Sequence, residues 1–202
     1  WKNFGTDYFL ERREIGIFNI GGDGVITADG VEYRLGYKDC LYITKGTREV
    51  FFKSCEKERP AKFYMVSAPA HTAYETKLLT IKDAVKRQLG DEASSNRRVL
   101  NQFIHPALEP GSVWNSMPCH THERRMEIYM YFEVPENQVV MHFMGEPAQT
   151  RHLVMKNEEA VISPSWSIHC GAGTSNYTFI WAMGGENQAF DDMDNLRADE
   201  LK

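Results

Sequence analysis

An all-β fold is the structure that the sequence predicts. Short apolar runs of strand length fill the chain before residue 55 and after residue 113. The first group comprises 15–20, 24–27, 31–35, 40–44 and 49–52, and the second comprises 126–134, 139–144, 152–155, 160–162 and 177–183. Between the early runs, Gly21-Gly22, Asp29-Gly30 and Lys45-Gly46 provide the positive φ angles of tight hairpins. Strands of this length and spacing are typical of a β-sandwich or a β-barrel.

The range 67–112 has a different composition from the rest of the chain. Its apolar residues between Leu78 and Leu89 have a spacing that a short amphipathic helix could use, but a polar stretch from Gly90 to Asn96 follows at once. We therefore predict two β-modules, 1–66 and 113–202, joined by a linker over 67–112 with at most one short helix.

The composition is that of a folded globular protein. The chain has 202 residues, a net charge of −5 and 42% hydrophobic residues, enough for one large domain or two small ones. The acidic balance disfavours a nucleic-acid partner, which needs a clustered Lys/Arg surface. No apolar run approaches the roughly 20 residues that cross a bilayer. The four cysteines, Cys40, Cys55, Cys119 and Cys170, lack CxxC spacing, so we predict reduced thiols and a cytoplasmic protein without a membrane partner.

The densest chemical signal lies in the segment Met117-Pro-Cys-His-Thr-His-Glu-Arg-Arg-Met-Glu127. Alternate residues of a strand point to one face, so His120 and His122 should project together, and a short turn can return Glu127 beside them. His169 follows a later apolar strand and can provide a fourth ligand. Two or three imidazoles and a carboxylate suit Zn, Fe, Mn, Ni or Co. The competing interpretation is a solvated charge cluster of Glu127 with a neighbouring arginine.

Two further histidines, His142 and His152, lie in predicted strands. We expect them to be structural or to support the ligands, rather than to bind the metal themselves.

The pattern His120-x-His122-x4-Glu127, followed by Pro164-x4-His169, resembles the two metal motifs of the cupin superfamily. Trp166 stands where many cupins have glycine. The N-terminal half resembles a cupin through its glycine turns but lacks His-x-His, and Glu49 stands where a metal-binding histidine would be expected. The resemblance implies a bicupin of two jelly-roll β-barrels, of which only the C-terminal barrel holds a metal.

A closer resemblance, covering nearly the whole chain, is to the 5-keto-4-deoxyuronate isomerase family. The strings that carry it are Tyr8-Phe-Leu-Glu-Arg-Arg13, Ala68-Pro-Ala-His71, Ser95-Asn-Arg-Arg98, Trp114 to Glu127, Ser163 to His169, Gly185-Glu-Asn-Gln188 and Phe190-Asp-Asp-Met-Asp194. The family resemblance implies a zinc enzyme that is typically a homohexamer, with His120, His122, Glu127 and His169 as the metal ligands.

Two departures from the family pattern stand out. The sequence begins at Trp1 without Met, and an N-terminal segment of family members is absent. Between Pro106 and Val113 the chain also looks short by about one strand. We therefore expect this sequence to be part of a longer enzyme.

The activity that the resemblance implies is an aldose–ketose isomerisation in pectin and uronate breakdown. It converts 5-dehydro-4-deoxy-D-glucuronate into 3-deoxy-D-glycero-2,5-hexodiulosonate through an enediolate, which a zinc ion can stabilise as a Lewis acid. The general base is left open among Glu123, Glu127, Tyr129 and Tyr131. A cation for the substrate carboxylate is sought among Arg124, Arg125 and Arg151.

Two other functions remain as alternatives. An iron-dependent cupin dioxygenase would use a similar ligand set and consume oxygen. A non-catalytic sugar-binding cupin would keep the barrels without turnover, but such a module has little need of the complete set of His120, His122, Glu127 and His169.

Overall fold

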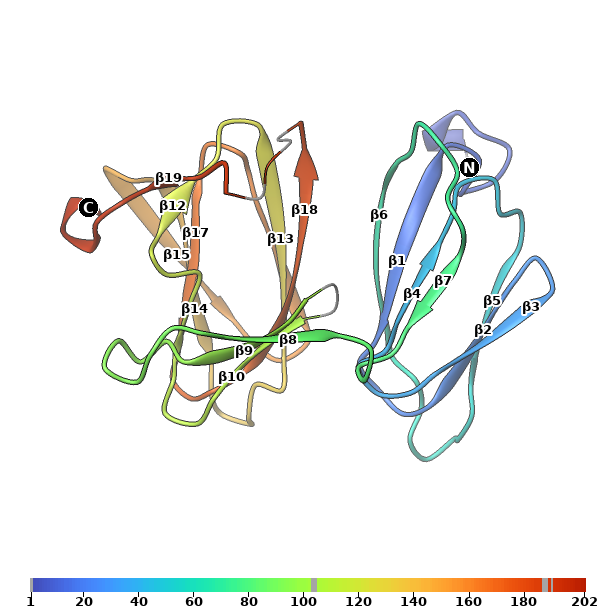
Figure 1. Ribbon diagram of the computed structural model, residues 1–202, viewed down its shortest axis with the longest axis horizontal. Coiled ribbons are helices and arrows are strands. Elements are labelled where there is room, and N and C mark those ends of the chain that lie inside the picture. The colour runs from blue at the N-terminus through green and yellow to red at the C-terminus, as the bar shows by residue number, and fades with distance from the viewer. Residues whose placement is uncertain (1, 103–104, 187–188, 190) are drawn as a thin grey trace. The chain divides into compact units, whose positions relative to one another are not determined.

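A computed structural model describes residues 2–102, 105–186, 189 and 191–202 of the chain (Figure 1). Trp1 and parts of the motifs at 185–188 and 190–194 lie outside the described residues. The chain divides into two compact units, Trp1–Ala84 and Val85–Lys202, called unit 1 and unit 2 below. Apart from two 3-10 turns, Lys2–Phe4 and Ala198–Glu200, the regular elements that the structure describes are β-strands. The predicted all-β class is confirmed.

Unit 1 consists of two antiparallel sheets packed face to face. One has the order β6-β1-β4-β7 and the other the order β3-β2-β5. Their bounds are β1 Arg13–Asn19, β2 Gly24–Ala28, β3 Val31–Leu35, β4 Cys40–Ile43, β5 Val50–Ser54, β6 Phe63–Pro69 and β7 Lys77–Leu79. Alternate residues of β1 and β2 are buried, as strands with one covered face require. Ile17 and Leu41 of the first sheet pack with Ile26 and Leu35 of the second in one apolar cluster.

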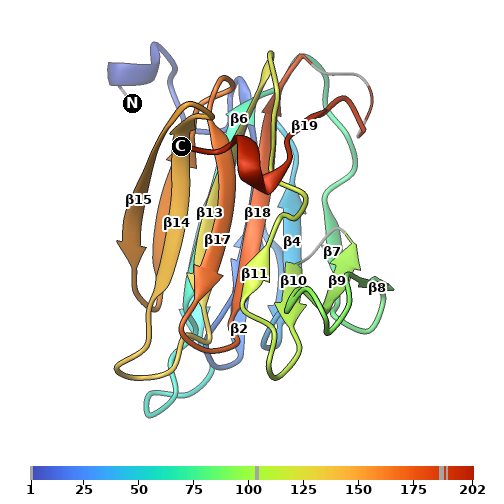
Figure 2. The same ribbon diagram turned by 90° about the vertical axis from the view of Figure 1, so that its left-hand side faces the viewer.

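Unit 2 is built around two larger sheets, and Figure 2 shows their strands β14, β17, β13 and β18 running nearly upright. The first has the order β16-β13-β18-β10-β9-β8 and the second the order β11-β17-β14-β15, and a short pair β12-β19 completes the unit. The bounds are β8 Val85–Leu89, β9 Arg98–Gln102, β10 His105–Leu108, β11 Trp114–Asn115, β12 His120–Thr121, β13 Arg125–Phe132, β14 Val140–Glu146, β15 Gln149–Met155, β16 Glu159–Ser163, β17 Ile168–Gly173, β18 Thr178–Gly185 and β19 Asp194–Asn195.

The interior of unit 2 contains both an apolar cluster and buried polar side chains. Tyr129, Tyr131, Val140 and Phe179 belong to one buried cluster that includes residues of both large sheets. Because Glu127, Tyr129 and Tyr131 alternate along β13, all three side chains face this interior. Strand β13 thus directs one carboxylate and two tyrosine side chains into the interior.

The range 67–112 differs from the predicted linker. It contains the end of β6, all of β7, and strands β8, β9 and β10, while the boundary between the units falls at Ala84 and Val85. No helix forms at Leu78 to Leu89, because β7 pairs with β4 and β8 pairs with β9. Both β7 and β8 are edge strands, and every residue of β8 is exposed. Edge strands of this kind lack the alternation of apolar residues by which a strand is recognised in a sequence.

The structure also bears on the cysteines and on membrane-spanning helices. The four cysteines are free thiols, as predicted. Among the residues that the structure describes, no helix has the length and apolar character needed to pass through a lipid bilayer.

Candidate metal centre

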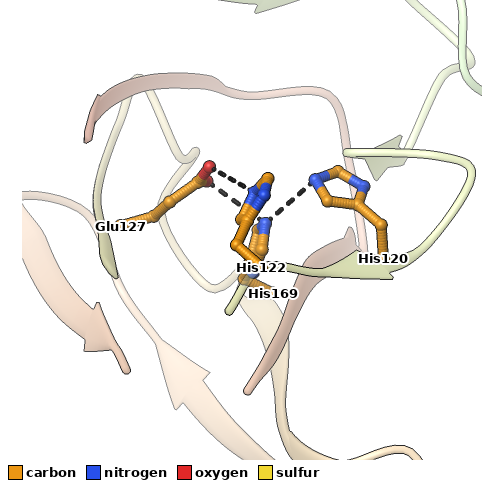
Figure 3. Close-up of side chains that lie close together, drawn as sticks. All are labelled: His120, His122, Glu127 and His169. Atoms are coloured by element: carbon orange, nitrogen blue, oxygen red, sulfur yellow. Dashed lines mark hydrogen bonds and ion pairs between the residues drawn. The ribbon is translucent and has the colours of Figure 1, made fainter. Parts of the chain in front are cut away.

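Four predicted side chains meet at one end of unit 2 (Figure 3). His120 lies on β12, His122 follows it directly, Glu127 lies on β13 and His169 on β17. One candidate ligand atom from each residue lies within 4.8 Å of those of the other three. His122, Glu127 and His169 are buried, whereas His120 is half-buried and borders the solvent. The structure therefore brings together the complete ligand set that the sequence suggested.

Local strand geometry explains why these residues converge. The turn at Glu123 and Arg124 reverses the chain between His122 and β13, so that Glu127 returns beside the two histidines. His169 arrives from a distant part of the sequence because β17 lies next to β14 in the other sheet. Strand β19 pairs with β12, placing the C-terminal segment against His120.

Each histidine of the cluster uses its Nδ1 atom to contact a backbone carbonyl. The distances are 3.0 Å from His120 to the oxygen of Pro118, 2.8 Å from His122 to that of Asp192 and 3.1 Å from His169 to that of Ser167. A carbonyl oxygen only accepts, so each Nδ1 must carry the hydrogen and each Nε2 keeps its lone pair. This is the tautomer that binds a metal through Nε2, with Nδ1 held by a partner.

The inward-facing atoms cannot satisfy one another. The Nε2 atoms of His120 and His169 are 3.0 Å apart, and Nε2 of His122 is 3.1 Å from Oε1 of Glu127. With the hydrogens on Nδ1, three lone pairs and a carboxylate face a common point, and no donor among them is left to pair these acceptors. A bound cation satisfies all four groups, so the donor set fits a metal ion such as zinc or iron.

Burial favours the neutral form of His120 and His169. Withdrawal from water lowers the pKa of His120, and it lowers the pKa of His169 to about 4. A neutral imidazole is the form that binds a metal, so these histidines need not lose a proton at neutral pH.

The chain matches proteins of a known family along nearly its whole length. The model of the KduI/IolB family matches residues 4–198. The chain belongs to this family. Two relatives named 4-deoxy-L-threo-5-hexosulose-uronate ketol-isomerase, from Yersinia enterocolitica and Yersinia pseudotuberculosis, are 53% and 54% identical to it over 214 aligned residues. Each alignment covers 100% of this chain and 77% of the relative. The resemblance to the ketol-isomerase family is therefore confirmed.

Solved structures show the same fold at much lower identity. An IolB-like protein of Salmonella typhimurium LT2 has a TM-score of 0.76 and 17% identity, covering 92% of this chain and 80% of that one. The oxalate decarboxylase of Lactobacillus farciminis has a TM-score of 0.62 and 10% identity, covering 92% of this chain and 74% of that one. These similarities establish the all-β, cupin-like architecture and nothing about activity.

The four candidates for a general base occupy different positions in this family member. Glu127 is in the cluster, and the hydroxyl of Tyr129 donates to its Oε2 at 2.9 Å. The Tyr131 hydroxyl contacts Nδ1 of His142 at 2.7 Å instead of a cluster residue. Glu123 is exposed in the turn before β13. Only Glu127 and Tyr129 are therefore placed to act at the cluster.

The two histidines expected to be structural also differ. His142 is fully buried, and its Nε2 atom lies 3.0 Å from the Ser163 hydroxyl. Burial lowers the pKa of His142 to about 3. His152 is exposed on β15, on the face opposite the interior, where its ring is near Phe143. Neither residue belongs to the group of candidate metal ligands.

The three arginines have unequal access to the centre. Arg124 is exposed and forms an ion pair of 3.6 Å with Glu186. Arg125 is buried, and its guanidinium donates to the backbone oxygen of Ala189. Arg151 is exposed on β15, and among the described residues no carboxylate pairs with it.

Other contributors to the centre are absent from the sequence prediction. The carbonyls of Pro118, Ser167 and Asp192 orient the histidines, but every residue has a carbonyl, so no sequence signal identifies these three. The Ser116 hydroxyl lies 2.7 Å from that of Tyr129. Its place in the string 114–127 is the only hint that the sequence offers.

Proposed function

We propose that this chain is a ketol-isomerase that acts on 4-deoxy-L-threo-5-hexosulose uronate in the breakdown of pectin-derived uronates. The product would be 3-deoxy-D-glycero-2,5-hexodiulosonate. The observation that carries the proposal is the buried cluster of three histidines and a glutamate, found in a chain that matches named ketol-isomerases over its whole length. Unit 2 does not need such a cluster to form its core, because a separate apolar cluster already packs in its interior.

The reaction requires a proton to move between adjacent carbons. A base removes the proton from C2, the electron pair forms an enediolate, and the proton returns to C1 while the hydroxyl proton passes from the C2 oxygen to the C1 oxygen. Nothing is oxidised or reduced overall. We propose zinc as the metal held by His120, His122, Glu127 and His169, and when bound it would supply Lewis-acid stabilisation of the enediolate oxygens.

Among the residues of the chain, Glu127 is the proposed proton carrier. Its carboxylate is the acidic group at the cluster, whereas the Glu123 side chain is exposed in the turn. Burial of Glu127 excludes bulk water from the carboxylate, which limits exchange of the transferred proton with solvent.

Arg151 is the proposed partner of the substrate carboxylate. Met144 is opposite His169 on one side and opposite Arg151 on the other, so the three residues lie abreast on the same face of the sheet. The strands that carry them, β17, β14 and β15, are labelled in Figure 2. Two strand spacings, about 10 Å, separate the backbones of Arg151 and His169. An extended six-carbon uronate and an arginine side chain together span such a distance. Arg124 is less suited because it pairs with Glu186, and Arg125 because its guanidinium is buried against the Ala189 carbonyl. Arg151 also donates to a carbonyl, that of Thr150 at 2.9 Å, but its side chain is exposed.

We also propose a bicupin organisation, a homohexameric assembly and a cytoplasmic location. The division into two compact β-units supports the first of these. Light scattering of the purified protein would measure the second, with a monomeric mass as the contrary result. Fractionation of the source cells would test the third.

The experiment that tests the activity combines metal analysis with an assay. The purified protein should contain about one zinc per chain and convert the ketouronate under anaerobic conditions without an added nucleotide. Stoichiometric iron with oxygen consumption would instead support the cupin dioxygenase alternative. Tight uronate binding without conversion, at full metal occupancy, would support a sugar-binding module.

A further inference from the structure

The Ser116 and Tyr129 hydroxyls form a short relay that ends on the metal-site carboxylate. Tyr129 donates to Oε2 of Glu127 at 2.9 Å, and the Ser116 Oγ lies 2.7 Å from the Tyr129 oxygen. A carboxylate only accepts, so the single Tyr129 proton points to Glu127 and the Ser116 proton points to Tyr129. The Glu127 carboxylate therefore determines the donor direction of both hydrogen bonds.

Packing of the Tyr129 ring and the backbone conformation of Ser116 fix the positions of the two hydroxyls. The Tyr129 ring is buried and stacks on Phe179 with ring centroids 5.5 Å apart. Ser116 has a φ of 49°, a left-handed conformation that residues other than glycine rarely adopt. Such outliers persist where the surrounding structure enforces them, and they cluster at functional sites.

The two oxygens of Glu127 consequently have different surroundings. Oε1 lies 3.1 Å from Nε2 of His122 and has no hydroxyl partner among the described residues. Oε2 lies 3.3 Å from Nε2 of His169 and accepts the hydrogen bond from the Tyr129 hydroxyl. The hydrogen bond favours Oε1 as the metal ligand and keeps Oε2 from becoming a second one.

We propose that Ser116 and Tyr129 are positioning residues that hold Glu127 to the metal through one oxygen only. This arrangement leaves a coordination position open for the substrate and leaves Oε2 available to take the C2 proton. The proposal rests on the proposed function for its catalytic consequence. Its structural content, the binding mode of Glu127, can be tested without substrate.

The test replaces the bound metal with Co²⁺ and compares visible absorption spectra. In Tyr129→Phe, Oε2 is released and can also bind, so the number of ligands rises and the cobalt absorption weakens. Ser116→Ala should change the spectrum in the same direction but less, because Tyr129 keeps its own proton. Tyr131→Phe is the matched control, since it removes an equally buried hydroxyl that contacts His142 and not Glu127. Its cobalt spectrum should equal that of the unmodified protein.

Activity provides a second readout. Tyr129→Phe should lower kcat by about 10- to 100-fold, with a much smaller change in KM, because supporting hydrogen bonds to metal ligands have effects of this size. An unchanged cobalt spectrum in Tyr129→Phe would overturn the proposal, even if activity fell. If Tyr129→Phe fails to fold, Ser116→Ala decides the matter alone, and an unchanged spectrum there is the contrary result. Absence of isomerase activity in the unmodified protein would refute the proposed function and leave the spectral test intact.

Discussion

The two units use the same kind of secondary structure for different interiors. In unit 1 the buried residues of β1 are Ile15, Ile17 and the last residue Asn19, and the two isoleucines pack in an apolar cluster. In unit 2 the corresponding inward run of β13 is Glu127, Tyr129 and Tyr131. The buried polar or charged residues described in unit 1 are Asn19, Asp39 and Thr47, all near turns, whereas those of unit 2 include three of the four cluster residues, His122, Glu127 and His169.

The difference shows where each unit obtains its stability. Burying an aliphatic side chain contributes about 1.5–3 kcal/mol, and unit 1 relies on this term. A buried polar group costs free energy unless it is paired. Unit 2 meets that cost with hydrogen bonds that tyrosine and serine hydroxyls donate and that backbone carbonyls accept. Its cluster of inward lone pairs remains unsatisfied until a cation binds. The second interior is thus organised for binding, and the first for packing.

The largest effect should follow from removing a ligand. We expect His122→Ala to lose the metal and to lower activity by more than about 100-fold, since even supporting groups are worth 10- to 100-fold. Metal content by mass spectrometry and the circular dichroism spectrum should show an empty but folded protein. His152→Ala is the control, because this histidine is exposed and outside the cluster. Full activity of His122→Ala would contradict the metal role.

Chelation tests whether the metal stabilises only unit 2. A ligand that binds only the folded state adds about 4 kcal/mol when its free concentration is about 1,000 times Kd. We expect chelation to remove stabilisation of this size and to speed amide hydrogen exchange in β13 and β17. Peptides from β1 and β4 serve as the internal reference and should be unaffected. Equal loss of protection in both units would mean that they unfold as one.

A core truncation in unit 1 gives the converse experiment. Ile17 is fully buried, so Ile17→Ala should lower the free energy of unfolding by about 2–5 kcal/mol. Because the cavity lies in the apolar cluster of unit 1, the metal content should not change. The exposed Val31 offers a matched control, and Val31→Ala should have little effect on denaturant unfolding. Loss of metal in Ile17→Ala would show that the interiors are coupled.

The smallest effect concerns pH. Burial lowers the pKa of His142 to about 3, below the ordinary value of 6.5. Below pH 6.5 His142 binds a proton in the unfolded chain but stays neutral in the folded protein. The free energy of unfolding therefore falls as the pH decreases toward 3. Between pH 6.5 and 5 this group should account for about 2 kcal/mol. Urea unfolding of the metal-free protein should show a shallower pH dependence for His142→Gln. Parallel pH profiles would show that folding does not lower the pKa of His142.

The sequence predicted some features of the centre well and others poorly. His120, His122 and Glu127 could be grouped because they lie within one strand–turn–strand segment, where the two-residue period determines which side chains share a face. Of the strands missed within 67–112, β7 and β8 are edge strands with little alternation, whereas β9 and β10 lie inside their sheet. Arg124, Arg125 and Arg151 could not be ranked, since their access depends on partners such as Glu186 and Ala189.

By itself, the sequence determined the all-β class, the family and the four candidate ligands, because turn glycines, strand periodicity and motif spacing are local properties of a chain. Tertiary structure alone decided how those ligands are oriented. The Asp192 carbonyl that holds His122 lies 70 residues away in the sequence, and the Ser116 hydroxyl reaches Glu127 only through Tyr129. Such contacts depend on the register between distant strands, which is set by the packing of the whole unit.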